Sequence, residues 1–65
     1  MDLNELKALR IRNGLKQRDL AELLCINTNS YTKKENETNP FTISEIKSLK
    51  EFFNMDDELF LRIFF

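Results

Sequence analysis

The segment between residues 28 and 36 carries the side chains that are best suited to binding another molecule. It reads Thr-Asn-Ser-Tyr-Thr-Lys-Lys-Glu-Asn, in which Tyr31 is the only large apolar residue. On a helix, the face opposite Tyr31 would present Asn29, Lys33 and Asn36. In duplex DNA, asparagine can form two hydrogen bonds with adenine, and lysine can donate to guanine. The segment is therefore either an ordinary solvated helix face or a surface that reads base edges.

Catalytic and metal-binding groups are scarce in this chain. It has no histidine, the side chain that most often acts as a base near neutral pH, so Cys25 has no histidine partner. A structural zinc site takes about four cysteine or histidine ligands, and only Cys25 is available. The run Asp56-Asp57-Glu58 is typical of a helix start rather than of a metal site. We therefore expect no enzyme activity, no metal and no cofactor.

The charges are unevenly distributed along the chain. The 10 Lys+Arg and 11 Asp+Glu give a net charge of −1, which argues weakly against nucleic acid as a partner. However, residues 7–34 hold seven basic and two acidic groups, a local charge of +5. Residues 41–65 hold three basic and five acidic groups, a local charge of −2. The sequence thus predicts a positive region that can meet DNA phosphates and an acidic region behind it.

One glycine and one proline in 65 residues favour a helical fold. Apolar periodicity and capping residues predict helices over about residues 3–13, 17–24, 28–36, 43–53 and 57–63. Asp2 with Glu5, and Thr42 with Glu45, have the spacing of capping boxes. The expected fold class is all-α, in a single domain over residues 1–65 whose small core leaves its stability marginal.

Only Cys25, Ile26 and Asn27 separate the second and third predicted helices, and two helices joined by so short a turn form a helix-turn-helix. The pattern Gln-x-x-Leu-Ala-x-x-Leu begins at Gln17, and Tyr-x-Lys-Lys-Glu-Asn begins at Tyr31. In this register the sequence resembles the Cro/repressor (XRE) family, and it is similar to small phage and mobile-element regulators of Gram-positive bacteria. The resemblance covers about residues 3–60.

The resemblance implies a compact five-helix, lambda-repressor-like domain that binds duplex DNA sequence-specifically. The third helix would enter the major groove and contact base edges through its start and outer face, with Thr28, Asn29, Ser30 and Lys33. Phosphate contacts would come from residues around the start of the second helix and along the third, namely Gln17, Asn27, Thr32, Asn36, Lys16 and Arg18. Each of these side chains has an ordinary surface role as its alternative.

Two charged residues are expected to pair inside the protein rather than to contact DNA. Arg10 lies four residues after Leu6, and Glu35 four residues after Tyr31, so both lean toward the core. We predict a partly buried structural ion pair between Arg10 and Glu35, which the resemblance supports.

Two residues depart from the family's pattern, because Cys25 and Glu37 each stand where the family often has glycine. Either both adopt positive φ, at a cost of ~1 kcal/mol each, or the turns differ. Gly14, in contrast, is well placed to end the first helix in a left-handed conformation.

All six phenylalanines follow residue 40, and they exceed what so small a core needs. Because exposed aromatic clusters mark interaction surfaces, a homodimer interface is predicted from Phe52, Ile63, Phe64 and Phe65. The alternative is that the last residues fold back over the core of the monomer.

The preferred function is a transcriptional regulator, a repressor that occupies an operator as a dimer. The alternative is a protein-interaction module, of the anti-repressor or antitoxin-like kind, that uses the Phe-rich C-terminal face. No run of about 18 apolar residues is present, so no membrane is expected as a partner. No small-molecule ligand is expected either. A lone thiol fits the reducing cytoplasm of a bacterium or phage-infected host.

Overall fold

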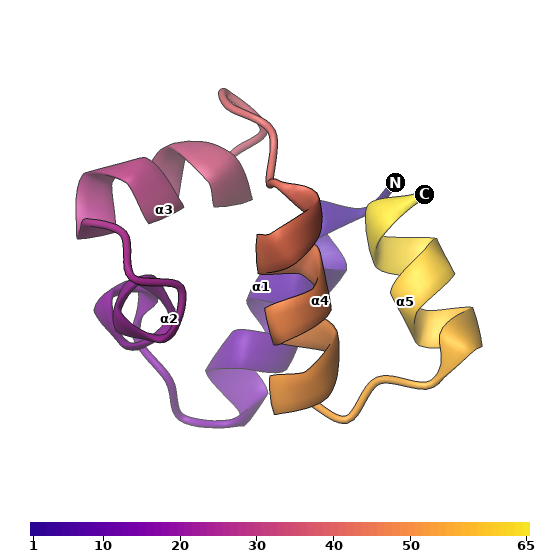
Figure 1. The fold of residues 1–65 in the computed structure, drawn as a ribbon. Helices are drawn as coiled ribbons and strands as arrows, with labels where there is room; N and C mark the ends of the chain where they lie inside the picture. Colours follow the sequence, from indigo (N-terminus) through magenta and orange to yellow (C-terminus); the bar gives the residue numbers. More distant parts are fainter.

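The computed structural model describes all 65 residues and contains five α-helices and no strand, which confirms the all-α fold class. The helices are α1 (Leu3–Arg12), α2 (Gln17–Leu23), α3 (Thr28–Glu35), α4 (Ile43–Phe52) and α5 (Asp57–Phe64). Each predicted helix is present, and no helix end differs from its predicted position by more than one residue. In Figure 1, α2 and α3 lie at one end of the molecule and α5 at the other, with α1 and α4 between them.

Every helix contributes one fully buried side chain to the core. These residues are Leu6, Leu20, Tyr31, Leu49 and Ile63. The core therefore joins the helix-turn-helix to α5 across the whole molecule, and the two chain termini meet beside α5 (Figure 1).

The first four helices end in the same way, with one residue in the left-handed region. These residues are Gly14 (φ 70°), Cys25 (φ 59°), Glu37 (φ 63°) and Asn54 (φ 51°). After each of them, the next N–H donates to a carbonyl five residues earlier, as Ile26 does to Ala21 at 3.0 Å. This pairing is the Schellman motif, which satisfies carbonyls that the helix end leaves free. Of the two alternatives left open by the sequence, Cys25 and Glu37 thus adopt positive φ, and they do so without being glycine.

The helix starts follow the predicted capping pattern in all but one case. The side chains of Asn27, Thr42 and Asp56 accept the N–H groups of Ser30, Glu45 and Leu59 at 2.7, 3.1 and 2.8 Å. They cap the starts of α3, α4 and α5.

The predicted Asp2–Glu5 capping box is wrong. The side chain of Asp2 makes no capping hydrogen bond. Glu5 instead accepts two hydrogen bonds from Arg62, at 2.8 and 2.6 Å. The charged partner on α5 attracts this carboxylate more strongly than the N–H of residue 2, and the pair joins α1 to α5.

Candidate nucleic-acid interface

The turn between α2 and α3 gives the two helices a fixed relative orientation. Cys25 turns the chain with its left-handed backbone, and Ile26 packs its side chain against the core. Ala21 is almost completely buried in the middle of α2, where a larger side chain would push α3 away. The arrangement is a helix-turn-helix whose second helix, α3, is held by the core along one side only.

Glu35 lies at the centre of a buried hydrogen-bond network behind α3. Its carboxylate accepts from Nε and Nη2 of Arg10, at 3.0 and 3.1 Å. It also accepts from the Tyr31 hydroxyl at 2.7 Å and from Gln17 Nε2 at 3.1 Å. Arg10 donates a further bond to the carbonyl of Leu15 at 3.0 Å. The structure therefore brings Arg10 and Glu35 together as the sequence predicted, and it ties α1, α2 and α3 to one carboxylate.

The network keeps Glu35 ionised. Burial alone would raise the pKa of its carboxyl, but hydrogen bonds from Arg10, Tyr31 and Gln17 outweigh burial and hold the pKa below its ordinary value. Burial and the bond to this carboxylate together raise the pKa of the Tyr31 hydroxyl. Tyr31 therefore stays a hydrogen-bond donor, and the network keeps one arrangement near neutral pH.

Gln17 and Thr32 form hydrogen bonds within this network, which limits what their side chains can offer to DNA. The hydroxyl of Thr32 donates to Gln17 Oε1 at 2.8 Å, while Gln17 Nε2 donates to Glu35. Both side chains are half-buried. An amide nitrogen carries two hydrogens, so Gln17 retains one donor for a phosphate, and its direction is set by the two internal bonds. The hydroxyl hydrogen of Thr32 is already used within the chain.

The outer face of α3 is unoccupied by contacts within the chain. Thr28, Asn29 and Lys33 are exposed, Ser30 is half-buried, and none of these side chains is hydrogen-bonded to another residue. The four predicted base-contacting residues thus all keep their donors and acceptors free for a ligand.

The remaining residues predicted to contact phosphates differ in how many side-chain hydrogen-bonding groups they have free. Lys16, Arg18 and Asn36 are exposed, and their side chains have no partner within the chain. Asn27 is also exposed, but its side-chain oxygen caps α3, so only its amide N–H groups are left for DNA.

The positive charge of this region is smaller than the sequence count indicated. Lys34 Nζ lies 2.6 and 2.7 Å from the two carboxylate oxygens of Glu45, and both side chains are largely buried. Arg10 is likewise paired with Glu35. The count over residues 7–34 omitted both carboxylates because they come later in the chain. Five exposed basic residues stay available, namely Lys7, Arg12, Lys16, Arg18 and Lys33.

The predicted dimer residues divide into two groups. Phe52 and Phe65 are exposed, whereas Ile63 and Phe64 are buried in the core of the chain. The interface prediction is therefore wrong for Ile63, which is fully buried, whereas Phe64 is buried except where it lines a surface pocket. The end of α5 folds back over the monomer core, because these two side chains lie on the face of α5 that packs inward.

Comparison with known protein families identifies this arrangement. A family model described as "Helix-turn-helix" matches residues 6–60, which include both helices, the turn, α4 and the first half of α5. The chain belongs to the Cro/repressor-type (XRE) helix-turn-helix family. No curated protein and no solved structure matches it significantly. As a member of this family, the chain is a DNA-binding helix-turn-helix regulator with a lambda-repressor-like fold.

Some features of this helix-turn-helix regulator escaped the sequence reasoning. The bonds that Gln17 makes to Glu35 and Thr32 have no local signal, because they join residues 15 or more apart in the chain. The Lys34–Glu45 pair likewise has no local signal, because it joins residues 11 positions apart. No helix has the length and apolar character that crossing a membrane requires.

Proposed function

We propose that this regulator is a repressor that reads a specific operator in duplex DNA through α3 and binds it as a homodimer in the cytoplasm. The observation that carries the proposal is the free outer face of α3. Asn29 and Lys33 lie on it without internal partners, and the buried network behind it fixes the orientation of the helix. Fixed donors and acceptors on a helix that fits the major groove are what direct readout of base edges requires.

Contacts to the DNA backbone would set the position of α3 in the groove. The start of α2 carries Lys16, Gln17 and Arg18, and Gln17 has one free side-chain N–H. The two ends of α3 carry Asn27 and Asn36. Phosphate contacts fix orientation but carry no sequence information. Because ion pairs within the chain neutralise Arg10 and Lys34, we expect modest affinity for random DNA, so that base contacts and dimer symmetry provide much of the binding energy.

A dimer would double the reading surface. Two recognition helices about 34 Å apart can enter successive major grooves and read a near-palindromic operator. Phe52 and Phe65 are the phenylalanines of the predicted interface that are exposed, and we assign Phe65, at the end of α5, to the partner. We propose that the dimer represses by occupying the operator.

The proposal is tested by measuring DNA affinity across a range of salt concentrations. Operator-like duplexes are first selected from a random pool, and binding of the wild type, Lys33→Ala and Lys47→Ala is then compared on selected and random DNA. Lys33→Ala should lose ~1–3 kcal/mol on the selected duplex and relax its preference at one base position. Lys47 is an exposed lysine of α4, outside the helix-turn-helix, and its substitution should change little.

Salt dependence separates this proposal from the protein-interaction module. The logarithm of DNA affinity should fall by about 0.9 per phosphate contact for each logarithmic unit of salt. Apolar pairing with a protein would hardly respond to salt. Equal losses for Lys33→Ala and Lys47→Ala, on selected and random duplexes alike, would contradict readout by α3.

A further inference from the structure

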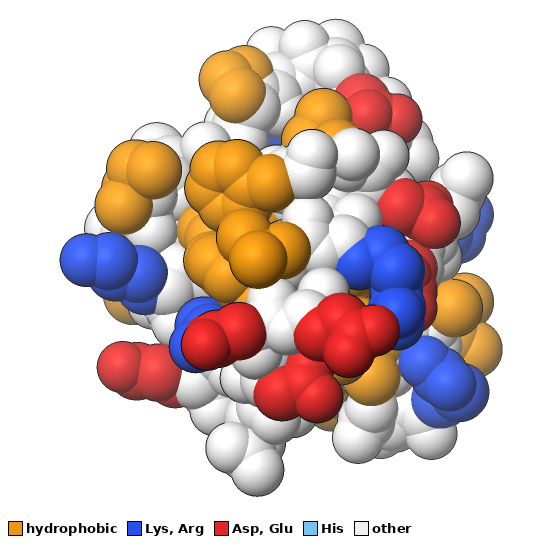
Figure 2. Space-filling model, turned by 90° about the vertical axis from the view of Figure 1, so that its right-hand side faces the viewer, with side chains coloured by type: hydrophobic (Ala, Val, Ile, Leu, Met, Phe, Trp, Pro, Cys, Tyr) orange, Lys and Arg blue, Asp and Glu red, His pale blue; other side chains and the backbone are white.

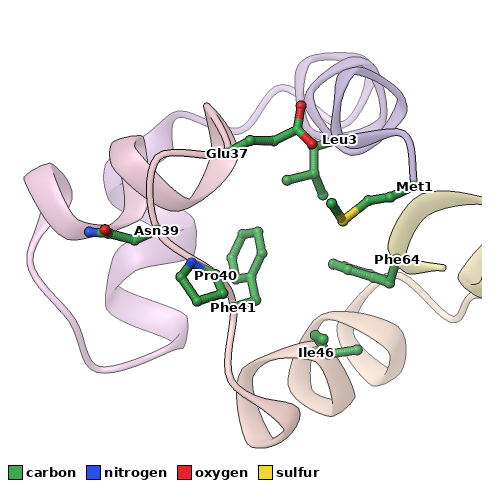
Figure 3. Close-up of a pocket in the computed structure, with 8 residues that line it drawn as sticks. All are labelled: Met1, Leu3, Glu37, Asn39, Pro40, Phe41, Ile46 and Phe64. Atoms are coloured by element: carbon green, nitrogen blue, oxygen red, sulfur yellow. The ribbon is translucent and has the colours of Figure 1, made fainter.

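A pocket of about 300 Å³ opens at the end of the molecule where the chain termini meet. It lies between the α3–α4 connection, the first turn of α1 and the last turn of α5. Figure 3 shows its apolar side chains pointing toward a common space, while Asn39 points away. The apolar wall consists of Met1, Leu3, Phe41, Ile46 and Phe64, with Pro40 at the edge. No side chain of the same chain fills this space.

A large apolar side chain projects from the surface close to this pocket. Phe65 is 69% exposed and follows Phe64, which lines the pocket. The amino group of Met1, another lining residue, donates to the carbonyl of Phe65 at 3.3 Å. Figure 2 shows hydrophobic side chains gathered on the face that carries α5, with acidic and basic side chains along their border. The ring of Phe65 lies 5.9 Å from the ring of Phe60 and keeps most of its surface exposed, and its backbone adjoins Phe64 and Met1, which line the pocket.

We infer that a second copy of this chain occupies the pocket, with Phe65 of each copy inserted into the pocket of the other. The inference rests on the dimer of the proposed function and specifies how that dimer forms. In a twofold interface, a contact of residue i with residue j is repeated as j with i. A ring and a pocket that lie side by side satisfy this rule, because one rotation axis between them fills both pockets at once.

Charge at the mouth of the pocket favours the same occupant. Glu37 lies at the rim, and its carboxylate has no ion pair or hydrogen bond within the chain. Arg62 precedes Phe65 by one helical turn. Its Nε and Nη2 donate to Glu5, and its Nη1 lies 4.0 Å from a carboxylate oxygen of Glu58 without a hydrogen bond. When Phe65 enters the pocket of a second copy, Arg62 comes to the mouth with further N–H groups for Glu37.

The dimensions of the chain agree with operator binding by such a dimer. The longest extent of the molecule is 28 Å. Half of the ~34 Å spacing between successive major grooves is about 17 Å, so each recognition helix must lie about that far from the twofold axis. In Figure 1, α3 lies at the opposite end of the molecule from α5. If the twofold axis runs beside Phe65, a distance of about 17 Å from the axis to α3 fits within the 28 Å extent of one chain.

Sedimentation equilibrium of the full chain tests the inference with three variants. Phe65→Ala removes the inserted ring, and Ile46→Phe fills the pocket from within. Phe52→Ala is the matched control, because Phe52 is also an exposed phenylalanine but packs against Phe53 at the far end of α4. Loss of a buried aromatic anchor should raise the dimer dissociation constant at least about thirtyfold for Phe65→Ala. Phe52→Ala should leave it within about threefold, as expected of a contact outside the hot spot.

Mixing the two defective variants gives the sharpest result. Phe65→Ala keeps an open pocket, and Ile46→Phe keeps its ring, so an equimolar mixture should form heterodimers although each variant alone is monomeric. Far-UV circular dichroism checks that Ile46→Phe is folded. If Ile46→Phe is unfolded, the dissociation constants of Phe65→Ala and Phe52→Ala still test the inference. Both residues are exposed, so we expect both variants to fold.

Three results would overturn the inference. The first is a dimer that survives Phe65→Ala, and the second is a dimer that Phe52→Ala dissociates instead. Both leave the proposed DNA binding intact, because that activity is read separately from the affinity of each variant for a single half-site duplex. The third is a wild-type chain that is monomeric both free and on a full operator duplex.

Discussion

Replacing Arg10 by methionine removes three hydrogen bonds from the network behind α3. Two of them go to the carboxylate of Glu35 and one to the carbonyl of Leu15. The methionine fills the space of the arginine stem, but Glu35 stays buried with only Tyr31 and Gln17 as donors. Removing one partner of a buried ion pair costs about 3–5 kcal/mol.

That loss is large for a chain of this size. At about 0.05–0.15 kcal/mol per residue, a 65-residue domain has ~3–10 kcal/mol of stability in total. Urea denaturation followed by far-UV circular dichroism should therefore give Arg10→Met a midpoint lower by ~1–3 M, or no folded baseline at all. Arg12→Met, an exposed arginine on the same helix, should stay within about 0.5 kcal/mol of the wild type.

The pH dependence of the same measurement identifies the cause. In the wild type the pKa of Glu35 is held below its ordinary 4.5, so its contribution to stability is present above that value and is lost as the pH falls below it. Without Arg10, burial raises the pKa of Glu35, and the variant should gain stability as acid protonates the carboxyl. The difference between the two proteins should therefore shrink on acidification. An Arg10→Met variant that is as stable as the wild type at neutral pH, or a difference that ignores pH, would refute the reasoning.

Three further outcomes are expected. Cys25→Gly should raise the unfolding free energy by ~1 kcal/mol, a rise in Tm of about 4–8 °C, because glycine adopts φ 59° without strain, whereas Cys25→Ala should give no gain. Lys34→Met should cost ~1–3 kcal/mol in urea denaturation, because it leaves Glu45 largely buried without its cation, and an unchanged midpoint would contradict this. Gln17→Ala should weaken binding to selected and random duplexes by the same factor, since a phosphate contact carries no sequence information, and a loss confined to selected duplexes would assign Gln17 a base contact.

Local sequence features predict most of the fold. The capping residues Asn27, Thr42 and Asp56 act as their positions indicated, whereas for Cys25 and Glu37 the sequence left open whether the backbone is left-handed or the turn differs. The caps depend on a few neighbouring residues, so the sequence displays them directly.

Tertiary contacts account for what the sequence did not reveal. Glu5 has the spacing of a capping residue, yet it binds Arg62, which is 57 positions away. Lys34 counts as free positive charge until the fold places Glu45 beside it. Ile63 and Phe64 resembled surplus hydrophobic residues because the short helix α5 does not indicate by itself which of its faces the core will bury.

Sequencing of the duplexes that the chain selects from a random pool tests the central claim most directly. With the wild type, we expect a consensus of two symmetric half-sites about one helical turn apart. The Lys33→Ala variant should select the same consensus with its preference lost at one base position in each half-site. A wild-type pool without any consensus, or a consensus that Lys33→Ala leaves unchanged at every position, would contradict the claim that α3 reads an operator.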